Sequence, residues 1–120
     1  MGSAGRSIDE LLEDITSWGE RLARFTSGIE RAQFQHDEIR QLAVWKSVEV
    51  IGEAAGNILK LYPAFVAVHP ELQFAEAYRM RNRLAHGYDS IDWAILWDTA
   101  AVHVPALIAR IEALKRPGSA

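Results

Sequence analysis

The stretch QLAVWKSVEVIGEAAGNILKLY, residues 41–62, carries the longest helical pattern in this chain of 120 residues. Its apolar residues recur every three or four positions, which is the period of a helix that buries one face. The stripe consists of Leu42, Trp45, Val48, Ile51, Ala55, Ile58 and Leu59, and Val44, Val50 and Ala54 broaden it. This width predicts burial on two sides, either at the centre of a bundle or partly against a second chain.

The ends of this helix are also marked in the sequence. Asp37 precedes the apolar stripe, and Pro63 follows it. Proline cannot continue a helix, and it biases the preceding residue, Tyr62, away from helical geometry. A helix from Asp37 to about Tyr62 is therefore predicted.

A second amphipathic pattern, from Ile8 to Phe25, comes before this helix. Its apolar positions are again three or four residues apart. Ser7 is placed to cap the N-terminus, and Glu10, three residues later, completes a capping box. The segment that follows contains Gly28 and breaks the stripe, which predicts a connection between the two helices.

A shorter helix is predicted from Glu71 to His86. Pro70 suits its first turn, because proline has the fixed backbone angle of a helix start. Gly87 suits the left-handed residue that commonly follows a helix.

The last helix is predicted from about Ile91 to Lys115. Asp89 or Ser90 can cap its N-terminus. Pro105 lies inside it, and a kink or short break is therefore expected at residues 101–104.

These patterns predict an all-α protein, an antiparallel bundle of four to five helices. No convincing alternating strand pattern appears, and a chain of this length has room for one domain with its own core. We expect that domain at residues 8–115, with a flexible tail at 1–7 and a frayed C-terminus at 116–120.

The composition narrows the classes of function. The chain has no cysteine, which excludes disulfides, thiolate zinc sites and a cysteine nucleophile and fits a reducing compartment. Its formal net charge of −3 provides no global attraction for nucleic acid. No apolar run approaches the ~20 residues that span a bilayer, and the start lacks the apolar region of a secretory signal. We expect a cytoplasmic protein without membrane contact.

The densest polar cluster is RMRNRLAHGYDSID, residues 79–92. Steps of about 100° per residue place Ala77, Met80 and Leu84 on the core side of its helix. Asn82 and His86 are neighbours, one turn apart, and point away from that side. The same steps place Arg79 and Arg83 on the outer half, and Arg81 between the two faces.

These side chains suffice, in principle, to cleave RNA without a metal ion. An imidazole exchanges protons near neutral pH, and a guanidinium stabilises charge that develops on phosphate oxygens. The 2′-hydroxyl of the RNA would then be the nucleophile. A basic helix end with the same residues often has no catalytic role, and the spacing alone leaves both readings open.

The motif R-N-R-L-A-H, Arg81 to His86, resembles the R-x-x-x-x-H signature of HEPN domains. With Gly87 and Tyr88 it is similar to the R-x-x-x-x-H-x-Y form of HepT-like toxins from MntA–HepT toxin–antitoxin systems. The likeness extends to the I-G-E-A stretch at residues 51–54 and to YDSIDWAILWDTA after the motif, and it covers the chain from about Ile8 to Leu114.

The resemblance implies a homodimer whose two motifs face a shared cleft, and a metal-independent endoribonuclease that needs no cofactor. Arg81 and His86 would be the catalytic pair, and Asn82 would support them. Tyr88 matches the tyrosine to which the family's nucleotidyltransferase antitoxin adds AMP, which silences the toxin. An AMP group beside His86 would block the cleft and repel RNA.

Several further residues belong to this interpretation. Arg79 and Arg83 are candidate phosphate or RNA contacts outside the signature. Glu49 and Glu53 lie one turn apart without a histidine at metal-ligand spacing, so no metal site is predicted. Glu53 belongs to the I-G-E-A stretch and is a candidate supporting residue behind the catalytic pair.

The remaining histidines and the tryptophans are given structural roles. His36, His69 and His103 are expected at the surface, whereas Trp18, Trp45, Trp93 and Trp97 are expected to pack in the core or at an interface.

A second function remains open from the sequence. The chain would then be a non-catalytic partner subunit of a small nucleotidyltransferase, in which the motif presents Tyr88 or binds a nucleotide or another substrate.

Overall fold

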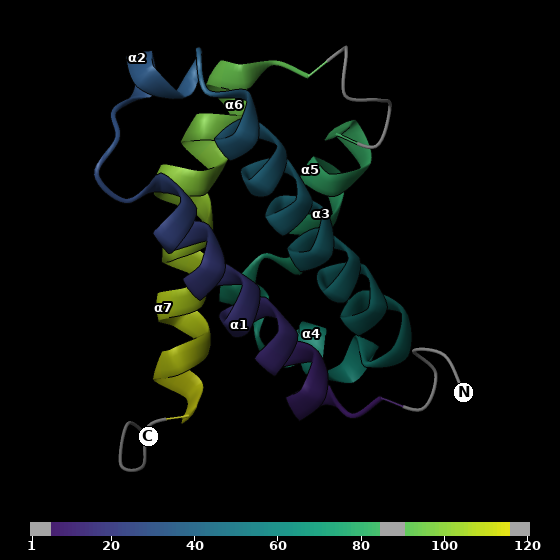
Figure 1. Ribbon diagram of the computed structural model, residues 1–120. Helices are drawn as coiled ribbons and strands as arrows, with labels where there is room; N and C mark the ends of the chain where they lie inside the picture. Colours follow the sequence, from purple (N-terminus) through teal and green to yellow (C-terminus); the bar gives the residue numbers. More distant parts are fainter. Residues whose placement is uncertain (1–5, 85–90, 116–120) are drawn as a thin grey trace.

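The computed structural model describes residues 6–84 and 91–115, with Lys115 described only in its backbone (Figure 1). These residues form helices and connections, without a strand, which confirms the predicted all-α class. The helical segments are α1 (Ile8–Thr26), α2 (Arg31–Phe34), α3 (Glu38–Leu61), α4 (Pro63–Val68), η2 (Pro70–Leu72), α5 (Phe74–Leu84), α6 (Trp93–Asp98), η4 (Thr99–His103) and α7 (Val104–Lys115).

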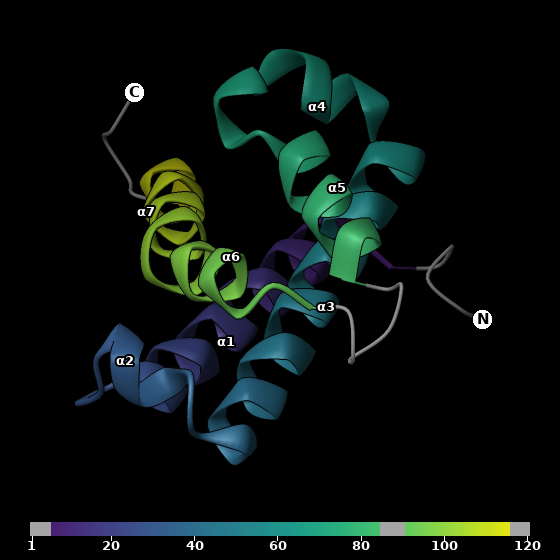
Figure 2. The same ribbon diagram turned by 90° about the horizontal axis from the view of Figure 1, so that it is seen from above.

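The long elements run alternately up and down through the molecule (Figure 1), and Figure 2 shows the same helices from above. Helix α3 lies at the centre, because α1 and α5 both pack extensively on it. The last three elements, α6, η4 and α7, follow one another. Of these, η4 and α7 pack along α1, whereas α6 contacts α2 and α3. The broad stripe of α3 therefore reflects its central position in the bundle, which is one of the two predicted explanations. The predicted dimer stays a prediction.

Helix α1 begins with the predicted capping box. The backbone N–H of Glu10 donates to Ser7 Oγ, and the N–H of Ser7 donates to the Glu10 carboxylate at 2.9 Å. The hydrogen bond from the Ser7 N–H to the carboxylate lowers the pKa of Glu10. The preceding residue, Arg6, forms an ion pair with Asp14, and its carbonyl accepts a hydrogen bond from the Tyr62 hydroxyl.

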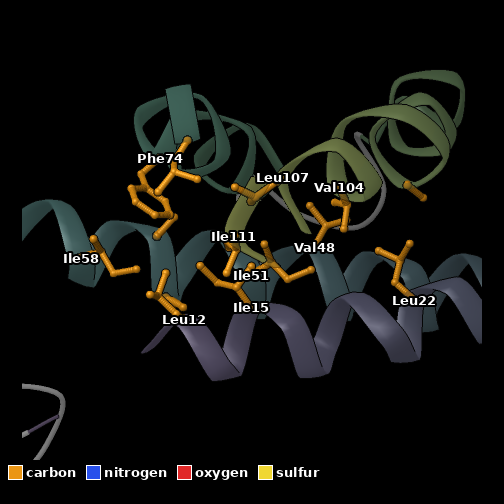
Figure 3. Packing of buried hydrophobic residues seen from close by; sticks show 14 of the residues in the cluster. Leu12, Ile15, Leu22, Val48, Ile51, Ile58, Phe74, Val104, Leu107 and Ile111 are labelled. Carbon is orange, nitrogen blue, oxygen red and sulfur yellow. The ribbon is translucent and has the colours of Figure 1, made fainter. Parts of the chain in front are cut away.

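The hydrophobic core lies where α1, α3, α5 and α7 meet (Figure 3). Its largest fully buried side chains include Ile15 of α1, Ile51 of α3, Phe74 of α5 and Ile111 of α7. Each helix contributes residues at spacings of three and four, so burial of these stripes is what joins the helices.

The buried face of α3 differs from the predicted stripe at three positions. Leu42 is 43% exposed, whereas the polar residue before it, Gln41, is buried. The Gln41 amide donates to the Phe34 carbonyl at 2.9 Å, which satisfies a backbone acceptor in the core. Ser47 is buried for a related reason, since its hydroxyl donates to the Ala43 carbonyl. Hydrogen bonding thus determines which polar side chains are buried, and hydropathy alone does not predict them.

The prediction of one helix from Glu71 to His86 is wrong at its start. Gln73 adopts φ 54°, in the left-handed region, and separates η2 from α5. Leu72 and Phe74 flank it and are both almost fully buried. In one continuous helix these two residues would lie about 200° apart, so the break lets both side chains reach the core.

The last helix also begins later than predicted. The side chain of Asp92 caps it, accepting from the N–H groups of Ala94 and Ile95. The proposed caps, Asp89 and Ser90, lie outside the described residues. The predicted irregularity before Pro105 is confirmed as a π-helical turn, η4, at Thr99–His103. Proline has no N–H to donate, and the wider turn accommodates that loss.

By length and composition, the helix Trp93–Leu114 is apolar enough to cross a membrane, although no single apolar run predicted it. One face of this helix is buried in the bundle, through Leu96, Ala100, Val104, Leu107 and Ile111. This spacing of three and four is the pattern of a helix that packs along a protein core.

Helix α5, which carries the start of the motif, is held mainly by α3. Two glycines one turn apart on α3 allow the contact. A Cβ atom at Gly52 would lie 2.1 Å from Cβ of Arg81, and one at Gly56 would lie 2.4 Å from the Tyr78 ring. An apolar cavity lined in part by Leu107 separates α5 from α7. The position of α5 therefore depends on its contact with α3.

We expect Gly52→Ala to lower the free energy of unfolding. The new methyl group would overlap the Arg81 stem and approach the Ala77 carbonyl at 3.0 Å. Overpacking of this kind costs ~1–3 kcal/mol, and the better helix propensity of alanine offsets about 1 kcal/mol. Chemical denaturation measures the difference. Gly19→Ala is the matched control with a smaller expected loss, because it meets the end of the Ile108 side chain, which can rotate. Equal losses in the two variants would contradict the close contact at Gly52.

We expect the stabilisation of α3 by Asp37 to depend on pH. Asp37 accepts from the backbone N–H and the guanidinium of Arg40, and these hydrogen bonds lower its pKa below the ordinary 3.8. A lowered folded-state pKa stabilises the fold above 3.8, and this contribution is lost as the pH falls through the folded-state value. Wild type should exceed Asp37→Asn in stability near neutral pH and lose that advantage in acid. A difference that does not change with pH would contradict this cap.

Candidate active site

The motif begins on the last turns of α5, and the structure describes it as far as Leu84. Leu84 is buried and Met80 packs against the core, whereas Asn82 and Arg83 are exposed. These positions confirm the faces predicted from helical phase. The candidate residues His86 and Tyr88 lie outside the described residues.

Arg81 lies between the two faces, as predicted, and its side chain is 28% exposed. Its stem passes Gly52 on α3, which no larger residue would allow without a shift. Its Nη2 lies 2.9 Å from a carboxylate oxygen of Glu53, and its Nη1 donates to Asn82 Oδ1 at 3.1 Å. The Nε–H is buried and has no hydrogen-bond partner among the described residues. The Arg81 stem is thus fixed against α3, and its guanidinium has two partners, Glu53 and Asn82.

The sequence predicted only part of this arrangement. It proposed Arg81 and Asn82 for the site and Glu53 as a supporting residue, and the structure brings the three together. Their catalytic roles stay predictions. The I-G-E-A stretch carried the signal for Glu53, while Gly52 beside it explains how α5 comes close enough.

A polar hollow opens beside this guanidinium. It lies between α1, α3 and α5, and it is lined by Arg6, Asp14, Lys46, Glu49, Val50, Glu53, Ala54, Asn57 and Arg81. Opposite charges alternate across it, because Arg6 pairs with Asp14 and Lys46 pairs with Glu49 at 3.1 Å. Sequence reasoning missed Arg6 and Asp14, which lie far from the motif along the chain.

The other two arginines of the cluster extend from the helix into solvent. Arg79 forms an ion pair with Glu76 one turn before it, and both side chains are more than 60% exposed. Arg83 is exposed on the same outer half. Both are accessible to an anionic ligand, and their predicted contacts with RNA remain predictions.

A tryptophan of α3 anchors the end of α5. Trp45 Nε1 donates to the Leu84 carbonyl at 3.3 Å, across the α3–α5 contact. This carbonyl belongs to the last helical turn, where backbone acceptors lack partners within the helix. The bond lies two residues before His86 in the chain.

The structure also describes the four tryptophans and the three other histidines, to which the sequence assigned structural roles. Trp18, Trp45, Trp93 and Trp97 pack against the core, as predicted. His36 and His103 are exposed, and His69 is half-buried beside Phe65 with Glu71 at 3.1 Å. The backbone N–H of Glu71 and, to a smaller extent, the hydrogen bond with His69 lower the pKa of the Glu71 carboxyl.

The fold and the site together define a small all-α protein with a fixed arginine in the last turn of α5, at which the R-x-x-x-x-H motif of the sequence begins. The chain belongs to the ribonuclease HepT-like family, whose model matches residues 15–114. No solved structure matches the chain significantly.

Relatives in two archaea support this assignment. The chain is 37% identical to the protein of Thermococcus cleftensis named "Probable ribonuclease HepT", over 92% of this chain and 98% of that one. It is 31% identical to "Putative RNase MJ0125" of Methanocaldococcus jannaschii, over 89% of this chain and 90% of that one.

We expect Trp45→Phe to loosen the end of α5 while it leaves the core intact. Phenylalanine keeps an aromatic ring but cannot donate to the Leu84 carbonyl, and a lost hydrogen bond of this kind costs ~1 kcal/mol. Amide hydrogen exchange should become faster in the last turn of α5 and stay unchanged in α1. Unchanged exchange at Leu84 would show that the indole N–H does not hold this turn.

Proposed function

We propose that this protein is the toxin of a toxin–antitoxin pair and acts as a metal-independent endoribonuclease. The observation that supports this best is the guanidinium of Arg81, held by Glu53 and Asn82 at the edge of a polar hollow. The stem of a fixed arginine has lost its conformational freedom before the substrate binds. The guanidinium therefore needs no reorganisation to stabilise the charge of a transition state. The family and the names of the relatives support the coarser part of this proposal, a ribonuclease.

The proposed reaction uses the RNA as its own nucleophile. The 2′-oxygen attacks the adjacent phosphorus, the bond from phosphorus to the 5′-oxygen breaks, and the products are a 2′,3′-cyclic phosphate and a 5′-hydroxyl. The 2′-hydroxyl loses one proton and the leaving oxygen gains one, so no co-reactant is consumed. Arg81 stabilises the charge on the phosphate oxygens, and His86 transfers protons.

The proposed site lies in a cleft shared by two copies of the chain. The start of α3 carries two apolar side chains in contact with solvent, Ile39 at 82% and Leu42 at 43% exposure. They precede Trp45, which holds Leu84. A partner copy that covers them would bring its own motif toward this one.

The proposed control is the addition of AMP to Tyr88 by a nucleotidyltransferase antitoxin. The phenolic oxygen would displace pyrophosphate from ATP and form a phosphodiester with AMP. The added negative charge would lie two residues from His86, where it repels RNA and fills the cleft. The localisation that fits this function is the cytoplasm.

The proposed reaction is tested with purified protein whose intact mass shows no AMP on Tyr88. Wild type should cleave RNA in the presence of EDTA and leave 2′,3′-cyclic phosphate ends. Arg81→Ala and His86→Ala should each reduce turnover by about a hundredfold or more. Arg24→Ala on α1 and His103→Ala on η4 are matched controls at exposed positions and should keep full activity.

Two outcomes would contradict the proposal. Unmodified wild type that leaves RNA intact would exclude the ribonuclease, and activity lost with EDTA and restored by a divalent metal would exclude the metal-independent reaction. A protein that carries AMP on Tyr88 must first be treated with a phosphodiesterase, after which the same two outcomes apply.

A further inference from the structure

We propose that Glu53 is the positioning residue for Arg81, and that it sets the orientation of the guanidinium before RNA binds. This inference rests on the proposed function, because it assigns Glu53 a task in the same site. It also makes a structural claim that holds whether or not the chain cleaves RNA.

The position of Glu53 follows from its neighbour in the sequence. Gly52 brings the backbone of α3 against the Arg81 stem, and the next residue therefore stands beside the guanidinium. The Glu53 carboxylate approaches Nη2 at 2.9 Å, while Asn82 accepts from Nη1 on the other side. Glu53 of α3 thus fixes Nη2 of the planar group, and Asn82 of α5 fixes Nη1.

The pattern of donors shows what this arrangement leaves for a substrate. A guanidinium carries five N–H groups, one on Nε and two on each Nη. The Nε–H is buried, one Nη1–H is donated to Asn82, and Nη2 faces Glu53. Each Nη still has a second N–H, and these two are the ones that a phosphate can reach.

The ion pair is too exposed for a large contribution to stability. The Glu53 side chain is 56% exposed, and pairs in such surroundings contribute little because water screens them. Its effect is therefore expected in the geometry of Arg81 and not in the free energy of unfolding.

A competing explanation gives Glu53 the opposite effect. As a negative charge beside Arg81, it could simply compete with RNA phosphate for the guanidinium. Removal of that charge would then tighten RNA binding without a loss of turnover. Positioning predicts a loss of turnover with little change in RNA binding, since an interaction that matters in the transition state appears in kcat.

The kinetic test compares Glu53→Gln and Glu53→Ala with Glu20→Gln. Glu20 is the matched control, because it is an exposed glutamate on α1 that does not line the polar hollow. We expect Glu53→Ala to lower kcat about ten- to hundredfold while KM changes by less than about threefold. Glu53→Gln should recover part of the loss, because its amide oxygen still accepts from Nη2. Glu20→Gln should resemble wild type.

The structural test uses the ¹⁵N–¹H resonance of Arg81 Nε. A buried Nε–H in a fixed guanidinium exchanges slowly with water, and its resonance should be visible in wild type and in Glu20→Gln. We expect it to broaden or disappear in Glu53→Ala at a temperature at which the protein is folded.

Three results would overturn the positioning role. They are a lower KM with unchanged kcat in Glu53→Gln, wild-type kinetics in Glu53→Ala, or an unaltered Arg81 resonance in Glu53→Ala. Failure of the proposed function has a different signature, since Arg81→Ala would then cleave RNA as wild type does, or wild type would not cleave it at all. The Arg81 resonance still decides the positioning claim in that case.

Discussion

The close contact between α3 and α5 is the constraint on which the site depends. Helix α5 packs mainly on α3, and an apolar cavity separates it from α7. The contact is possible because Gly52 and Gly56 present bare backbone to Arg81 and Tyr78. Small residues one turn apart bring two helices nearer than larger side chains allow. A change in that approach therefore moves the arginine of the motif relative to the rest of the bundle.

The electrostatics of the site follow from the same contact. The chain carries a net negative charge, so it has no general attraction for RNA. Instead, each cation around the polar hollow faces an acid, as Arg6 faces Asp14 and Arg81 faces Glu53. Such pairing limits nonspecific binding of anions while it keeps a guanidinium in place. Arg83, on the outer half of α5, remains exposed and can add attraction for phosphate.

The fold was largely predictable because periodicity and capping act over a few residues. The capping box of Ser7 and Glu10 is an example, since both partners lie within one turn. The features of the fold that were not predicted depend on tertiary contacts. Gln73 takes a left-handed conformation so that both flanking apolar residues reach the core, and no local signal marks it. Gln41 is buried because it satisfies a carbonyl of another helix.

The candidate site was predictable to a smaller extent. Helical phase placed Arg81 and Asn82 correctly, and the resemblance to HepT-like toxins drew attention to Glu53. Neither could show that the Glu53 carboxylate contacts the Arg81 guanidinium, because that contact depends on how closely α5 packs against α3. Arg6 and Asp14 were missed for a similar reason, since only the fold brings them to the hollow.

The turnover of Gly52→Ala on a short RNA tests the link between helix contact and chemistry most directly. The measurement is made at a temperature at which circular dichroism shows the variant to be fully folded, so that a loss of stability does not affect it. We expect kcat to fall by about tenfold or more, because the added methyl group displaces the Arg81 stem. A folded Gly52→Ala protein with wild-type turnover would contradict the dependence of the site on this contact.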